Sequence, residues 1–196
     1  MALIDDSYFI GEISLPNISR WINTFNQLIN KYEKEVLTDL MGYPLYTLFS
    51  AGIAEETPDQ IWLDIRDGKE FSFEYDGVTV TRKWNGLINA DKVSLIAYYC
   101  YYKIIFESLT DTTGIGEVLG NPENSVNKDN IAKAVNAWNK FIDLYGYTCG
   151  YDFSKFNDTY YTFTDRPSAY NFLNANRDIY PTWEFEVKRT INRFGI

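Results

Sequence analysis

The chain has 196 residues, of which 45% are hydrophobic, 23% charged and 17% aromatic, which is the composition of an ordinary globular domain with a substantial core. Its net charge of −9 argues against binding to phosphate backbones or anionic membranes, and residues 1–75 hold 13 of the 27 acidic residues but 5 of the 18 basic ones. The chain has no histidine, which excludes the usual general base, the Ser–His and Cys–His nucleophile pairs and most zinc sites.

The first predicted element is an amphipathic helix from about residue 17 to residue 41. Its apolar residues recur at spacings of three and four, at Trp21, Phe25, Leu28, Ile29, Tyr32, Val36, Leu37 and Leu40. Gly42 suits the position just after a helix end, and Pro44 opens a short second helix that ends at Gly52. A third helix is predicted over residues 57–67, with Gly68 after it.

Residues 70–84 change to a period of two and predict a β-hairpin. Phe71, Phe73 and Tyr75 alternate with polar residues, and an Asp-Gly pair separates them from Val78 and Val80. Because an isolated hairpin is marginal in water, this one must pack on helices or on a neighbouring subunit. We hypothesise that its aromatic face is a partner interface, needed for assembly rather than for the fold.

A fourth helix is predicted from Lys92 to about Leu109, with Asp91 as its cap, and it contains the stretch "SLIAYYCYYKIIF". A helix that is apolar nearly all round is buried on most sides. The other cysteine, Cys149, is far away in the sequence, so Cys100 is interpreted as a small buried hydrophobe and not as part of a metal or redox site. A polar connector is expected over residues 110–130. Its "TGIGEVLG" follows a helix and has neither the dinucleotide-binding spacing nor a P-loop lysine.

A fifth helix is predicted over residues 131–145, and the chain then becomes aromatic and irregular. Residues 147–196 are expected to form a carboxyl-terminal arm that packs on the domain or on a partner. Its end alternates apolar and acidic residues and then places apolar anchors in a basic rim, a pattern for docking on a partner. The proposed contact residues of the arm are Trp183, Phe185, Arg189, Arg193, Phe194 and Ile196.

The fold prediction is therefore mainly α: a bundle of about five helices over residues 1–146, an inserted β-hairpin at 70–84 and an irregular aromatic arm. No catalytic, cofactor-binding or metal-binding residue is predicted, and we expect no enzyme. The carboxylate pairs Asp64 with Asp67 and Glu35 with Asp39 are interpreted as solvated charges. No signal peptide and no membrane-spanning run is recognised, and the two cysteines are expected to be reduced thiols inside a cell.

Several stretches also carry a resemblance to a known group of proteins. These are "INKYEKEVLTDLMGYPLYTLFSAG", "IWLDIRDGKEF" with the hairpin, "KWNGL", "SLIAYYCYYKIIF", "TTGIG" and "AVNAWNKFIDLYG". In pattern and element order, residues 32–146 resemble small virion proteins of tailed phages that infect gut Bacteroidetes, including crAss-like phages. In outline the chain also resembles head–tail connector (adaptor) proteins.

The resemblance implies a structural protein of the phage neck. It implies a ring of twelve copies beneath the portal, with the portal protein and a tail or second neck protein as partners. DNA would pass through the channel without specific contacts, no membrane is involved, and the protein would be made in the host bacterial cytoplasm. Two other classes stay open: another virion interaction module, such as a tail-completion or head-decoration protein, and a small enzyme or regulator that uses carboxylates.

Overall fold

The structure is a computed structural model of the whole chain. It describes residues 2–15, 22–75, 77–108, 110–113, 116–119, 127–146 and 167–191, with the side chains of these residues except 22–23, 75 and 107–130. The described residues form two short 3₁₀ turns, five α-helices and two β-hairpins. In chain order these are η1 (Asp6–Tyr8), η2 (Gly11–Ile13), α1 (Ile22–Ile53), α2 (Gln60–Asp67), β1 (Lys69–Tyr75), β2 (Val78–Trp84), α3 (Leu95–Ser108), β3 (Thr110–Thr113), β4 (Gly116–Leu119), α4 (Asn127–Tyr145) and α5 (Ala169–Ala175).

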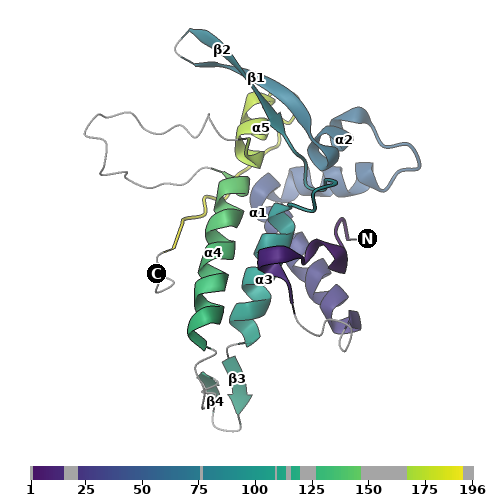
Figure 1. Cartoon of the computed structure of the whole chain (residues 1–196). Helices are drawn as coiled ribbons and strands as arrows, with labels where there is room; N and C mark the ends of the chain where they lie inside the picture. Colours follow the sequence, from purple (N-terminus) through teal and green to yellow (C-terminus); the bar gives the residue numbers. More distant parts are fainter. Residues whose placement is uncertain are drawn as a thin grey trace.

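The prediction of a mainly helical fold with an inserted β-hairpin is confirmed. Figure 1 shows α3 and α4 side by side and antiparallel, with α1 packed behind α3. The β1–β2 hairpin crosses α5 at one end of this helix pair, and the β3–β4 hairpin lies at the other end. The amino-terminal turns lie against α3 and α4.

The core forms where the predicted apolar stripe of α1 meets α3. The predicted stripe residues that lie fully inside are Phe25, Ile29, Tyr32, Val36, Leu37 and Leu40. On α3 the seven consecutive residues from Leu95 to Tyr101 each have an exposed fraction of 6% or less. This helix is therefore surrounded, as its apolar sequence predicts.

The start of α3 differs from the prediction. Lys92 has a φ of 58°, which no helix accommodates, so Asp91 cannot cap a helix there. The helix begins at Leu95, and Ser94 is its cap: the Ser94 hydroxyl accepts a hydrogen bond from the N–H of Ile96 at 3.2 Å and donates to the carbonyl of Leu87 at 2.6 Å. The hydroxyl of Ser94 thus satisfies one of the N–H groups that the first turn of a helix leaves without a partner.

The connector predicted over residues 110–130 also contains structure. Thr110–Thr113 pairs with Gly116–Leu119 in an antiparallel hairpin, and α4 begins at Asn127 instead of about residue 131. The threonine-rich first strand is the sequence signal that was missed, since β-branched residues suit strands.

Candidate interaction surfaces

The carboxyl-terminal arm lies against a break in α1. Gly42, with φ 74° and ψ 154°, interrupts the helix, in agreement with the helix end predicted there. Pro44 has no N–H, so the carbonyl of Leu40 lacks the donor that a continuous helix would supply. The indole Nε1–H of Trp183 donates to this carbonyl at 2.8 Å.

Backbone N–H groups of the arm bind two further carbonyls of α1, on either side of that of Leu40. The N–H of Glu184 donates to the carbonyl of Met41 at 3.1 Å, and the N–H of Glu186 donates to that of Asp39 at 2.9 Å. A Cβ at position 42 would lie 2.6 Å from the Cβ of Glu184, so only glycine lets the arm approach this closely. The arm thus caps the end of the first half of α1, where a helix has carbonyls without partners.

Further along, the arm is held by α4. The indole Nε1–H of Trp138 donates to the carbonyl of Arg189 at 2.6 Å, and the hydroxyl of Tyr145 donates to the carbonyl of Glu186 at 2.8 Å. The side-chain amide of Asn139 donates to the carbonyl of Ile191 and accepts from its N–H, both at 3.1 Å. The described part of the arm therefore packs on its own chain.

An ion pair adds to this contact. The ammonium of Lys188 lies 2.7 Å from Asp39 of α1 and 2.6 Å from Glu186, and the side chains of Lys188 and Asp39 are only 15% and 18% exposed. Burial works against the charge of Lys188, but its hydrogen bonds to the two carboxylates outweigh this and raise its pKa.

The predicted contact residues of the arm consequently differ in their accessibility. Trp183 is 4% exposed, so it is available to a partner only if the arm leaves α1. Phe185 is half-buried, with its ring centroid 4.9 Å from that of Tyr145. Arg189 has an exposed side chain. The remaining predictions, Arg193, Phe194 and Ile196, lie outside the described residues.

The base of the β1–β2 hairpin is also part of the core. Phe71 is 5% exposed, and its ring meets that of Phe172 of α5 edge to face at 5.8 Å. Trp84 is 3% exposed, stacks on the same Phe172 at 6.3 Å and donates its indole N–H to the carbonyl of Ile65 at 3.0 Å. The aromatic face predicted for a partner is thus covered at its base by α5, a helix that the sequence pattern does not connect to the hairpin.

The outer part of the hairpin has a different environment. Phe73 is half-buried, the side chain of Tyr75 lies outside the described residues, and Val78 is 62% exposed. The hairpin is therefore buried at its base and exposed toward its turn. Its proposed role as an interface remains a prediction, now confined to this outer part.

Helix α5 lies between the two predicted interfaces. Phe172 meets the hairpin, whereas the ring of Tyr170 lies 5.4 Å from that of Trp183 and 4.7 Å from that of Phe185 in the arm. An open hollow forms between α5 and the arm. It is lined by Tyr170, Arg177, Trp183, Glu184, Phe185 and Val187.

Within each carboxylate pair noted in the sequence, the two carboxylates bind different side chains instead of acting together. Asp64 is 6% exposed and accepts from Gln60 at 2.8 Å and from Lys69 at 2.7 Å, while Asp67 binds the guanidinium of its neighbour Arg66 at 2.6 Å. Asp64 is therefore a buried, paired group rather than the solvated charge that was expected. No group of three or more His, Cys, Asp or Glu side chains is placed to hold a metal in the described ranges.

Glu35 and Cys100 are likewise engaged by the core. Burial alone would raise the pKa of Glu35, but hydrogen bonds from Lys103 and Tyr99, both at 2.8 Å, lower it below its ordinary value. Cys100 is fully buried, and burial raises the pKa of its thiol, so it is chemically inert.

Glu33 is a buried charge that the sequence analysis missed. It is 7% exposed, and its carboxylate accepts from the N–H of Leu3 at 2.9 Å and from that of Ile4 at 3.4 Å. Burial raises its pKa to about 7. Its position was the available signal: it lies four residues after Ile29 and four before Leu37, within the apolar stripe of α1.

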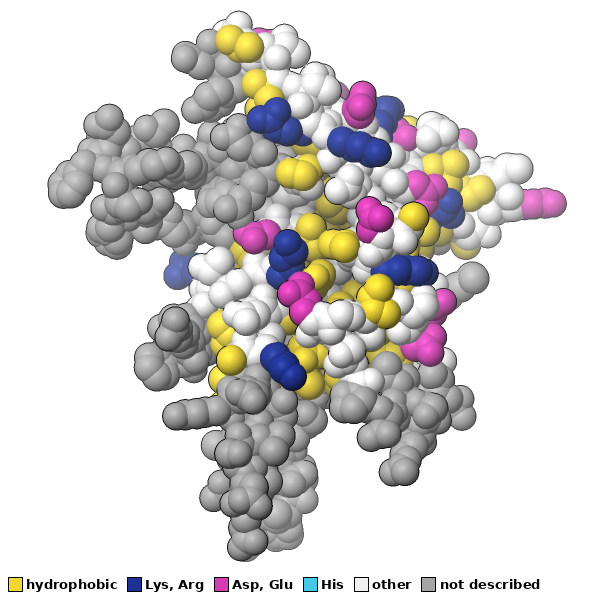
Figure 2. Space-filling model, in the orientation of Figure 1, with side chains coloured by type: hydrophobic (Ala, Val, Ile, Leu, Met, Phe, Trp, Pro, Cys, Tyr) yellow, Lys and Arg dark blue, Asp and Glu magenta, His cyan; other side chains and the backbone are white. Residues whose placement is uncertain are grey.

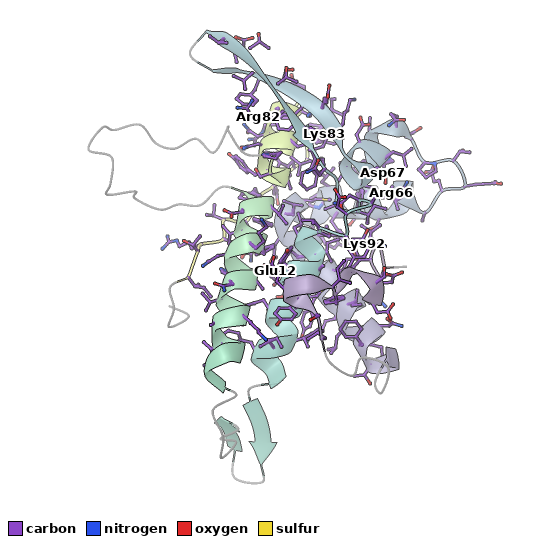
Figure 3. The ribbon with its side chains drawn as sticks, viewed as in Figure 1. Glu12, Arg66, Asp67, Arg82, Lys83 and Lys92 are labelled. Carbon is purple, nitrogen blue, oxygen red and sulfur yellow. The ribbon has the colours of Figure 1, made fainter. Side chains whose placement is uncertain are left out.

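The surface shows both charge signs interspersed on the face drawn in Figure 2, with hydrophobic side chains between them. Figure 3 shows Arg82 and Lys83 on the hairpin and the ion-paired Arg66 and Asp67 below them on α2. Large hydrophobic side chains are also exposed. They include Ile10, Tyr43, Leu48, Ile61, Val78, Val93, Phe106, Ile131, Ile179 and Val187.

Comparison with known proteins identified no relatives: no protein-family model, curated protein or solved structure matches this chain. Among the helices of the described residues, none combines the length and the apolarity needed to span a membrane.

Proposed function

We propose that this chain is a structural virion protein that forms a ring in the head–tail connector of a tailed phage. In this role it joins the portal to the tail or to a second neck protein and surrounds the channel through which DNA passes. The proposal places the protein in the neck of the virion, after its synthesis in the cytoplasm of the bacterial host.

The observation that carries the proposal is the β1–β2 hairpin. Phe71 and Trp84 fix its base in the core, while Val78 near its turn is 62% exposed. A rigidly held but projecting element of this kind is suited to contact a neighbouring subunit, because it is already ordered before the contact forms. The resemblance of residues 32–146 to small virion proteins of tailed phages, and of the chain in outline to head–tail connector proteins, supports the same role.

The charge distribution fits a DNA channel. The excess of acidic residues in the first 75 residues opposes tight binding of phosphates, which would hold the DNA in the channel. In the loop between α1 and α2, Glu55, Glu56 and Asp59 are all exposed. DNA is accordingly a passing molecule and not a ligand.

Reconstruction of the phage particle tests this function directly. We expect density for this chain as a cyclic ring between the portal and the tail, and particles made without the protein should have filled heads that lack tails. Density on the capsid surface would instead indicate a head-decoration protein, and density at the far end of the tail a tail-completion protein. Absence of the chain from the particle would overturn the virion assignment.

A further inference from the structure

Both strands of the β1–β2 hairpin have an outer edge. In the described part of the chain their sheet contains no third strand, and the seven residues of β1 pair with the seven of β2 without a bulge. Neither strand contains proline. Such an edge is a template for another strand unless something blocks it.

The register determines which residues present backbone groups outward. Tyr75 and Val78 are partners across a two-residue turn, so they bond to each other and the pairs alternate from there. The outward-facing positions are then Thr79, Thr81 and Lys83 on β2. One contact agrees with this assignment: the carbonyl of Thr81 accepts from the guanidinium of Arg82 at 3.0 Å, outside the ladder.

On β1 the same alternation gives Glu70, Ser72 and Glu74 as the outward-facing positions, and all three side chains are exposed. One edge is thus acidic, while the other carries Lys83. Two β1 edges paired in full overlap would place Glu70 opposite Glu74 of the other copy, and like charges directly opposite are destabilising. Two β2 edges would place Lys83 opposite Thr79, which gains no charge pair.

Pairing β1 with β2 of another copy removes this conflict. In full antiparallel overlap, Glu70 meets Lys83 of the neighbour and Ser72 meets Thr81 of the neighbour. This is the register that the hairpin already has internally, where Glu70 is the partner of Lys83 and the hydroxyls of Ser72 and Thr81 lie 2.9 Å apart. Each Lys83 would then lie between two Glu70 carboxylates.

We propose that neighbouring copies of this chain join by strand addition, with the outer edge of β1 in one copy pairing antiparallel with the outer edge of β2 in the next. The two edges differ, so the contact is head-to-tail and continues from copy to copy until a ring closes. All hairpins then point the same way, as cyclic symmetry requires. The inference rests on the proposed ring, because it takes the partner to be another copy.

Disulfide trapping tests this register. In a Cys149→Ser background, Ser72→Cys protein is mixed with Thr81→Cys protein and oxidised, both as concentrated free protein and in assembled particles. Directly opposed residues in a hydrogen-bonded pair are about 5.5 Å apart between Cα atoms, which a disulfide spans. The matched control mixes Ser72→Cys with Thr79→Cys, a diagonal pair about 7–8 Å apart. Cys100 is fully buried and does not interfere.

The expected result is a mixed dimer from the first mixture, well above the level of the control. A dimer formed mainly by Thr81→Cys protein alone would show a two-fold β2 contact and overturn the proposal. Absence of the mixed dimer in both samples would also overturn it. The ring function fails separately: a neck ring without this cross-link refutes the strand contact alone, whereas a cross-link in free protein together with a reconstruction that shows no density for this chain in the neck refutes the neck assignment alone.

Discussion

The carboxyl-terminal arm and the β1–β2 hairpin have the same kind of sequence, "TWEFEV" in one and "EFSFEY" in the other, and sequence reasoning treats both as candidate docking elements. In the structure the described end of the arm, up to residue 191, lies against its own chain: its N–H groups at Glu184 and Glu186 bind carbonyls of α1, and its carbonyl at Arg189 binds Trp138 of α4. The hairpin is attached at its base and leaves two strand edges outward.

This difference shows that alternating aromatic and polar residues predict an apolar face, but they do not predict which part of the protein covers that face. What separates the two regions is the supply of backbone partners. A broken helix offers unpaired carbonyls to the arm, whereas the hairpin pairs its inner groups within itself and, in the described part of the chain, has no third strand on its outer edges. The described part of the arm is therefore part of the fold, and the outer hairpin is the better candidate for assembly.

The largest expected effect on stability is that of Trp183→Ala, which removes the main contact between the arm and α1. It removes a large buried ring and leaves the carbonyl of Leu40 without its donor, so the free energy of unfolding should fall by about 3–5 kcal/mol. Urea unfolding of the free chain measures the change. Trp183→Phe, which keeps a ring but loses the N–H, should cost about 1–3 kcal/mol. A loss below about 1 kcal/mol for the alanine variant would mean that the arm does not lie on α1 in solution.

The amino-terminal segment is attached to α1 in a third way, through the buried carboxylate of Glu33. Burial raises the pKa of Glu33 to about 7, above the value near 4.3 of an unfolded chain. Between these pH values the folded state binds more protons than the unfolded state, so this group makes stability fall as pH rises. Glu33→Gln keeps an acceptor for Leu3 and cannot ionise. Its stability relative to the wild type should therefore increase by about 2–3 kcal/mol between pH 5 and pH 8.

Denaturation at a series of pH values measures this slope. Glu56→Gln, in the exposed loop after α1, changes the net charge equally without a buried site and is the control. If the Glu33→Gln and Glu56→Gln proteins follow the same pH dependence, the amino-terminal segment does not bury Glu33 in solution.

Gly42→Ala sharpens the comparison by separating backbone strain from contact with the arm. Gly42 and Gly77 both have φ 74°, but a Cβ at Gly42 meets Glu184 at 2.6 Å and a Cβ at Gly77 meets nothing within 4 Å. Each alanine substitution should cost about 1–3 kcal/mol from the positive φ, with the larger strain at Gly42, whose ψ of 154° lies in a region that is essentially restricted to glycine. Gly42→Ala should cost about 1–2 kcal/mol more, because the arm must shift. Equal losses of stability, measured by thermal unfolding, would show that the arm does not press on this position.

Much of the fold was accessible from the sequence because its signals are local. The stripe of α1, the end at Gly42 and the turn of the hairpin depend on spacing, on glycine and on proline within a few residues. The inert character of Cys100 followed from the apolar surroundings of its own helix. The second hairpin, β3–β4, was missed because its strands have only four residues each.

The surfaces could not be predicted in the same way, because they depend on contacts between distant segments. Nothing near Phe71 indicates that Phe172, about a hundred residues later, covers it. Nothing near Trp183 indicates that a proline in α1 leaves a carbonyl for its indole. The carboxylate of Glu33 was the exception, since its place within an apolar stripe was visible in the sequence.

The smallest effect on the free chain is expected at the outer end of the hairpin. Val78 is 62% exposed and Val187 of the arm is 41% exposed, so the two valines form a matched pair from the two regions. Val78→Ser should change the free energy of unfolding by no more than about 0.5 kcal/mol, because the side chain already meets water. In the proposed ring the same residue would lie next to the joined strand edges, where loss of an apolar, β-branched side chain weakens pairing. Sedimentation of the assembly should therefore show easier dissociation for Val78→Ser and no change for Val187→Ser. The opposite result, in which Val187→Ser weakens the assembly and Val78→Ser leaves it unchanged, would mean that the assembly interface lies on the arm and not on the hairpin.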